Sequence, residues 1–247
     1  MMVKDLTWYL LQKTDSLRKE IKKACTRSGN DSWLFIPKQR KNKVCLVAHI
    51  DTAQRENWGK KTIVHDKDQG ILWSPEGLSA DDRAGVWAVL HLYKTVPPEH
   101  QPYILLTDKE ERGGIGATEA VDIFGDILGS DAVSHFIEID RRGANDAVFY
   151  NNEPEEFRRY VTLFGFEEAH GTFSDISILG FEFEKCGVNL SAGYYNEHTP
   201  RELLNTKHLE NTVANVRLML EDNARNPELW PNPSEKTRDF KNDKFDF

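Results

Sequence analysis

Residues 44–53 read VCLVAHIDTA, a short apolar run that ends in a histidine and an aspartate. The run has the composition of a buried β-strand, with His49 at its end and Asp51 two residues later. Side chains two residues apart in an extended chain project to the same face, so a carboxylate lies where it can orient an imidazole. In α/β enzymes the chemistry is found where the strands end.

Four further clusters of acidic residues and histidine follow along the chain. They are SADDRAG at 79–85, DKEERGG at 108–114, IEIDRRG at 137–143 and NEHTPRE at 196–202. Each falls where we expect a strand to end or a helix to begin. Carboxylates and imidazoles are the ligands that divalent metals such as zinc take, so the five clusters together predict a two-metal hydrolase site.

Strand and helix patterns alternate along most of the chain. Apolar runs predict strands over 32–37, 43–49, 102–107, 134–140, 146–150 and 185–191, and helical spacing predicts helices over 82–95, 113–126, 153–164, 174–180 and 206–221. This alternation predicts an α/β fold, with a mostly parallel mixed central sheet and helices on both faces. We expect one catalytic domain over 1–225.

The remaining segments carry weaker signals. Residues 1–24 predict one amphipathic helix, and 61–65 with 70–74 predict a hairpin. The basic run KQRKNK at 38–43 is interpreted as the solvated turn of a hairpin between its flanking strands. Residues 226–247 combine prolines, charges and no periodicity, which predicts a polar C-terminal tail of surface or disordered character.

Composition excludes several classes of protein. The formal net charge of −8 argues against nucleic acid as a partner. No run of 18 apolar residues is available for a transmembrane helix, and the N-terminus lacks the features of a signal peptide, so we expect no membrane association. Three separated cysteines without CxxC spacing are typical of a reducing cytoplasm.

The paired acids indicate separate roles within a cluster. Glu110 and Glu111 follow a strand, and neighbours in extended geometry point opposite ways, so one can ligate metal while the other activates water. Asp81 and Asp82 open a helix, where one acid is sufficient as a cap. Asp140 ends its strand, and Glu138 competes with it for a ligand role at strand spacing.

These motifs resemble the metallopeptidase superfamily of co-catalytic zinc exopeptidases, over about residues 44–221. AHIDTA, ADDRAG and NEHTPRE are most similar to the tripeptidase and aminoacylase branch. EERGGIGA also resembles single-domain and tetrahedral zinc aminopeptidases. The resemblance implies the zinc-exopeptidase fold, which is phosphorylase/hydrolase-like.

The resemblance also implies roles, residue by residue. One zinc would be bound by His49 and Asp140 and the other by Glu111 and His198, while Asp81 bridges both. Glu110 would be the general base, and Asp51 would orient His49. The peptide bond between Asp81 and Asp82 is expected to be cis.

The sequence departs from the tripeptidase pattern in length, because 57 residues separate Asp140 from His198. That is too few for the lid domain inserted there in this branch, so substrate must be selected differently. Candidate pocket walls are 52–77 and 194–196. The candidate substrate-binding residues are Arg141, which alternatively belongs to a surface turn, His170 and Tyr195.

We therefore expect a di-zinc metallohydrolase, with cobalt or manganese as alternative metals. The leading hypothesis is an aminopeptidase that acts on short peptides. One alternative is an amidohydrolase of a non-peptide amide, either an N-acyl amino acid deacylase or a cyclase-like enzyme. Another is a catalytically silent binding module. The oligomeric state stays open.

Overall fold

The central feature of the fold is a mixed β-sheet of eight strands in the order β1-β2-β6-β3-β7-β10-β8-β9. The computed structural model describes residues 4–54, 56, 60–151 and 153–226. The four strands β6, β3, β7 and β10 run parallel to one another, and the two edges add antiparallel pairs. The predicted mostly parallel mixed sheet is therefore confirmed. Its strands are β1 Arg27–Ser28, β2 Ser32–Phe35, β3 Val44–His49, β6 Tyr103–Thr107, β7 His135–Arg141, β8 Asp146–Val148, β9 Glu167–Ala169 and β10 Cys186–Ser191.

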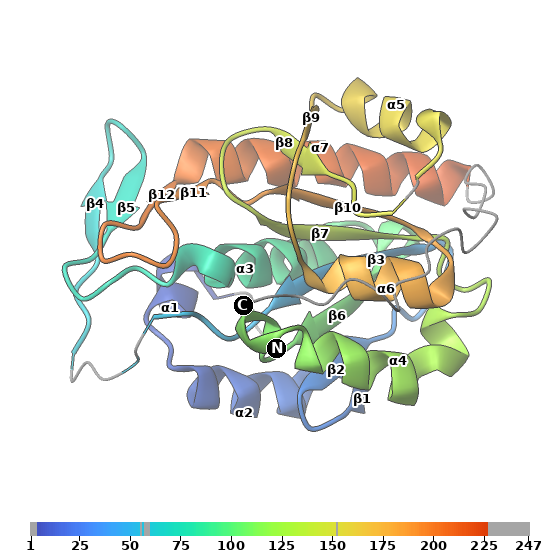
Figure 1. Cartoon of the computed structure of the whole chain (residues 1–247), viewed down its shortest axis with the longest axis horizontal. Coiled ribbons are helices and arrows are strands. Elements are labelled where there is room, and N and C mark those ends of the chain that lie inside the picture. The colour runs from blue at the N-terminus through green and yellow to red at the C-terminus, as the bar shows by residue number, and fades with distance from the viewer. Residues whose placement is uncertain (1–3, 55, 57–59, 152, 227–247) are drawn as a thin grey trace.

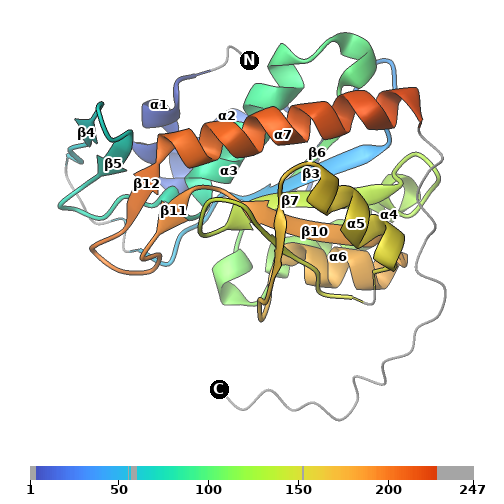
Figure 2. The same cartoon turned by 90° about the horizontal axis from the view of Figure 1, so that it is seen from above.

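Helices cover both faces of this sheet (Figures 1 and 2). In β3, Val44, Leu46 and Ala48 join the apolar core under α1 (Leu6–Leu10), α2 (Thr14–Ala24), α3 (Ala80–Thr95), α5 (Glu155–Leu163) and α7 (Thr206–Arg225). Cys45 and Val47 join the core under α4 (Ile115–Leu128) and α6 (Asp175–Phe183). Because alternate residues of a strand face opposite sides, a strand that is buried on both faces is apolar throughout.

The predicted hairpin between residues 32–37 and 43–49 is wrong. Strand β6 lies between β2 and β3, antiparallel to β2 and parallel to β3. The physical reason is burial, since all six residues of β3 are buried and the strand has a neighbour on each side. The basic run is therefore a crossing connection, and within it Asn42 is buried and donates to the carbonyl oxygens of His100 and Leu220.

The predicted single N-terminal helix is two helices, α1 and α2. The buried guanidinium of Arg83 donates to the Gln12 carbonyl and the Thr14 hydroxyl at the break. The backbone N–H of Thr14 donates to the Glu56 carboxylate. These contacts are tertiary, so helical periodicity alone does not predict the break.

A second, antiparallel sheet of four strands lies at one end of the molecule (Figure 1). Strands β4 (Val64–Asp66) and β5 (Ile71–Trp73) form the predicted hairpin. Strands β11 (Tyr194–Tyr195) and β12 (Leu203–Asn205) are too short to give a sequence signal, as are β1 and β9. The NEHTPRE loop joins β11 to β12, so this sheet carries the fifth cluster.

Residues 141–197 add strands and helices to the main fold and form no separate lid in the described part of the chain. The described residues also include two short 3₁₀ helices, η1 at Pro98–His100 and η2 at Glu110–Arg112. Among the described residues no helix combines the length and apolar character needed to cross a membrane. The predicted tail lies, beyond Asn226, outside the described residues.

Candidate metal centre

The acidic clusters meet at the carboxyl ends of three adjacent parallel strands. His49 ends β3, Glu110 and Glu111 lie in η2 just after β6, and Asp140 lies near the end of β7. Strand β6, which follows β3 in the main sheet, lies on one side of β3, and β7 lies on its other side. Such a reversal opens a crevice at the strand ends, which is where open α/β sheets bind ligands.

Asp81 lies between the two histidines and presents a different oxygen to each. Its Oδ1 is 3.1 Å from His49 Nε2, and its Oδ2 is 3.0 Å from His198 Nε2. These residues come from a strand end, a helix start and a loop of the small sheet. A carboxylate placed in this way has the geometry of a bridge between two cations.

Each histidine has one further carboxylate beside it. Asp140 Oδ1 is 3.3 Å from His49 Nε2, and Glu111 Oε1 is 3.1 Å from His198 Nε2. Two ligand atoms that each lie about 2.0–2.1 Å from a tetrahedral zinc ion are separated by roughly 3.3 Å. The distances between these donor atoms are therefore those of ligands that share a cation, and His49, Asp81 and Glu111 also lie close enough together to hold one.

Asp82 is a competing acid at the same place. The peptide bond between Asp81 and Asp82 is cis, as the resemblance implied. By distance alone, Asp82 groups with His49 and Asp140 as a possible cation site. Both of its oxygens, however, accept backbone N–H groups, Oδ2 from His49 and Oδ1 from Gly85. Asp81 is thus the acid whose oxygens face both histidines, whereas Asp82 anchors the backbone at the N-terminal end of α3.

Asp51 lies beside the Nδ1 atom of the His49 ring. Its Oδ1 lies 3.2 Å from His49 Nδ1 and also accepts the backbone N–H of Glu110. A carboxylate at Nδ1 favours the tautomer that leaves Nε2 free to ligate a cation. The same contact ties the first cluster to the third.

Glu110 points towards the same centre, with Oε2 3.9 Å from His49 Nε2. Burial, together with the charges of Asp140, Asp175 and Glu111, raises its pKa to about 9. Hydrogen bonds to Asp81 and Glu111 raise the pKa of His198 to about 11. Several carboxylates thus share a small buried volume, and bound cations would neutralise their charge.

The predicted substrate residues lie apart from the ligand set to different degrees. Arg141 donates to the backbone carbonyl of His170, so these two are neighbours, and the His170 residue is exposed. The hydroxyl of Tyr195 lies 2.7 Å from His208 Nδ1 on α7. Tyr194 instead donates to the carbonyl and the Oδ1 of Asp140. The structure thus brings Tyr194, and not Tyr195, to the candidate metal ligands.

Other contacts at the centre were not predicted from the sequence. Glu138, the competitor of Asp140, accepts a hydrogen bond from the Ser174 hydroxyl instead. Asn189 Oδ1 accepts the backbone N–H of Asp140. Glu202 accepts the backbone N–H of Asp81. Glu202 could have been identified from the sequence, because it is the last residue of the NEHTPRE cluster. Asn189 lies within an otherwise apolar buried strand, and no sequence pattern marks it.

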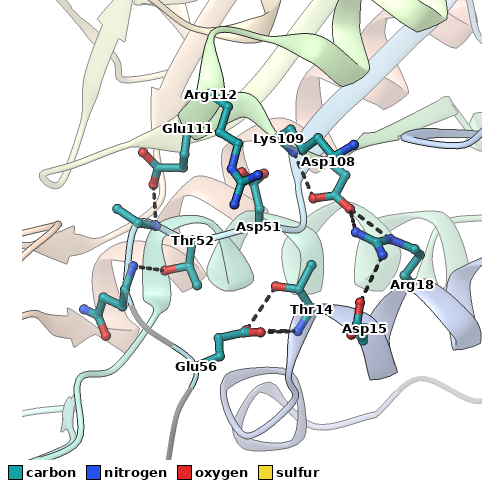
Figure 3. Close-up of a pocket in the computed structure, with 12 residues that line it drawn as sticks. Thr14, Asp15, Arg18, Asp51, Thr52, Glu56, Asp108, Lys109, Glu111 and Arg112 are labelled. Atoms are coloured by element: carbon teal, nitrogen blue, oxygen red, sulfur yellow. Dashed lines mark hydrogen bonds and ion pairs between the residues drawn. The ribbon is translucent and has the colours of Figure 1, made fainter.

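Two cavities flank the ligand set. The larger, of about 650 Å³, is lined by the start of α2, residues 51–54 and the loop that holds Glu111 (Figure 3). Most of its charged side chains are already paired, as Arg18 is with Asp108. The smaller, of about 360 Å³, lies beside His198 and residues 75–77. Both are lined by residues 53–54, so the predicted wall 52–77 does border space next to the centre.

No family model matches the sequence, and no curated protein matches it. Solved structures do resemble the fold. A tripeptidase from Staphylococcus aureus shares 15% identity with a TM-score of 0.63, over 89% of this chain and 96% of that one. Aminopeptidase PepT from Bacillus cereus shares 14% with a TM-score of 0.58, over 88% and 91%.

The TET1 peptidase of Pyrococcus horikoshii shares 13% identity with a TM-score of 0.59, over 83% of this chain and 92% of its own. At such identities the likeness is evidence for the fold alone. It agrees with the superfamily resemblance that the motifs carry. The chain therefore has the fold of the tripeptidase and aminopeptidase structures.

Proposed function

We propose that the chain is a di-zinc metallohydrolase that cleaves an amide bond, and specifically an aminopeptidase that acts on short peptides. The observation that carries the proposal is the placement of Asp81, whose two oxygens face His49 and His198 separately. A role as a helix cap alone would not explain why this carboxylate lies between two imidazoles.

The proposed ligands divide into two sets that share Asp81. His49 and Asp140 would hold one cation, and His198 and Glu111 would hold the other. When bound, such a pair lowers the pKa of a shared water and polarises the scissile carbonyl. The donor set of two imidazoles and three carboxylates suits zinc, and cobalt or manganese are alternatives.

The remaining groups of the centre have separate proposed tasks. Glu110 is placed to accept the proton of the attacking water and to deliver it to the leaving amine, once the charge of the bound cations lowers its raised pKa. Asp51 fixes the orientation of the His49 ring. Tyr194 fixes Asp140 through its hydroxyl. Cleavage then needs no covalent intermediate with the protein.

The choice of short peptides rests on the shape of the protein and on its structural neighbours. The described chain has no lid domain over the centre, and cavities of about 650 and 360 Å³ adjoin it. The structures that share the fold are described as a tripeptidase, an aminopeptidase and a TET peptidase. Arg141 and His170 remain candidates for contacts with the substrate.

A substrate panel tests this proposal. Zinc-loaded protein would be offered free tripeptides, N-terminally blocked tripeptides and N-acyl amino acids, with product followed by mass spectrometry. We expect release of the N-terminal residue from free peptides and no turnover of blocked ones. Cleavage of acyl amino acids alone would replace the aminopeptidase with an amidohydrolase. No cleavage of any substrate by metal-loaded protein would refute both activities.

A further inference from the structure

A buried carboxylate outside the proposed ligand set holds the backbone that carries Asp81. Glu202 is 1% exposed and precedes β12. Its Oε1 accepts the backbone N–H of Asp81 at 2.9 Å, and its Oε2 accepts the backbone N–H of Ser79 at 2.6 Å. One side chain thus satisfies backbone donors on both sides of Ala80.

The same backbone is also held by a buried lysine. Lys61 Nζ donates to the Leu78 carbonyl at 2.5 Å and to the Ser79 hydroxyl at 3.2 Å. Ser79 needs such support, because it adopts a left-handed conformation with φ of 60°. Residues 78–81 are therefore fixed between a buried amine that donates and a buried carboxyl group that accepts.

Glu202 also links Asp81 to the loop that bears His198. His198 is half exposed, so packing does little to fix its position, and it lies only four residues before Glu202. Gln54 adds a second link, because its Nε2 donates to Glu202 Oε2 at 2.6 Å and to the Thr199 carbonyl at 3.2 Å. The loop thus reaches Asp81 twice, through the His198 ring and through the Glu202 carboxylate.

We propose that Glu202 is a positioning residue, which sets the distance between the bridging carboxylate of Asp81 and the imidazole of His198. This inference rests on the proposed metal centre. Replacing Glu202 with Gln keeps the shape of the side chain but turns an accepting oxygen into an amide donor. A buried donor then faces the N–H of Ser79 or Asp81, and the loop must move to relieve the conflict.

Cobalt binding provides the test, because its visible absorption reports ligand geometry. Chelator-treated protein would be titrated with Co²⁺ by absorption and by calorimetry. For Glu202→Gln we expect the affinity for at least one cation to fall about 10–100-fold, with an altered spectrum. The matched control is Glu119→Gln in α4, whose carboxylate also accepts two backbone N–H groups, those of Asn30 and Asp31, but lines neither cavity beside the centre, and this variant should bind as wild type does.

Circular dichroism would verify that each variant is folded. If Glu202→Gln does not fold, Gln54→Leu carries the test, because it removes the link to Thr199 while the carboxylate stays in place; we expect it to weaken binding too. Wild-type affinities and an unchanged spectrum in the folded variant would overturn the positioning role. A wild-type protein that binds no cobalt would instead refute the metal centre itself, and the positioning role with it.

Discussion

Glu110 and Glu111 are adjacent acids for which the account predicts opposite phenotypes. Glu110→Gln removes the proposed proton acceptor, so we expect kcat to fall by about 10²–10⁴-fold while two cations remain bound. Glu111→Gln removes a proposed ligand that lies 3.1 Å from His198, so we expect one cation to be lost. Steady-state kinetics and elemental analysis of both variants would check the pair. The same metal content in both would contradict the division of roles.

Asp51 is expected to act through the His49 ring. Asp51→Ala removes the carboxylate 3.2 Å from His49 Nδ1, and we expect metal affinity to fall about 10–100-fold. The control is Asp15→Ala, which removes an exposed carboxylate from the lining of the same cavity. Competition with a chromogenic chelator measures both. Equal affinities in the two variants would show that the orientation of the ring does not depend on Asp51.

Single residues show how far the sequence predicts the site. The residue types predicted that the clusters at the carboxyl ends of β3, β6 and β7 would lie together, whereas the choice of side chain within each cluster came from the family resemblance. Spacing did not separate Asp81 from Asp82, or Asp140 from Glu138, because those choices depend on which oxygens already accept backbone N–H groups or a hydroxyl. The sequence also did not distinguish Tyr194 from Tyr195, because they face opposite sides of a strand of only two residues.

Helix α3 packs on β7 through a glycine of the second cluster. A Cβ at Gly85 would lie 1.9 Å from the backbone oxygen of Ile139, beside Asp140. We expect Gly85→Ala to lower the free energy of unfolding by about 1–3 kcal/mol, because α3 must move away from β7. Gly125→Ala in α4 is the control. Its Cβ would meet nothing closer than 3.7 Å, and it should stabilise by about 0.5–1 kcal/mol. Urea unfolding compares the two.

Strand β7 begins with a buried histidine that predicts a pH dependence of stability. Burial lowers the pKa of His135 to about 3, against 6.5 for a free side chain. A depressed pKa means that the folded state resists protonation. The neutral His135 side chain therefore contributes fully to the free energy of unfolding above pH 6.5. This contribution is lost as the pH falls towards 3, by about 1.4 kcal/mol per pH unit. We would therefore measure the free energy of unfolding in the presence of a chelator. Between pH 6 and 4 it should decrease less steeply for His135→Gln than for the wild type. Parallel curves would contradict this.

The elements that the sequence misplaced or missed depend on contacts distant in sequence or are too short to carry a pattern. Periodicity reports which faces of a segment are buried, not which strand lies next to it, so β2 and β3 were paired with each other although β6 separates them. The break between α1 and α2 depends on Arg83, which lies about 70 residues away. Strands of two or three residues, such as β11 and β12, carry too few side chains for any pattern.

At the scale of the whole molecule, the proposed centre joins two sheets. The main sheet supplies His49, Asp140 and the loop with Glu110 and Glu111, while the small sheet supplies His198 and Glu202. Ligands from five separate segments can meet only in the folded chain. Metal binding should therefore stabilise the folded state, and its loss should leave the carboxylates in mutual repulsion.

Metal content per chain tests the central claim most directly. Protein purified without chelator would be measured by elemental analysis, together with His198→Ala and Asp140→Ala. Because the proposed site holds two cations, we predict about two zinc ions per chain in the wild type. In each variant the zinc content should fall towards one or none. A wild-type protein that holds no metal, even after zinc is added back, would contradict the account.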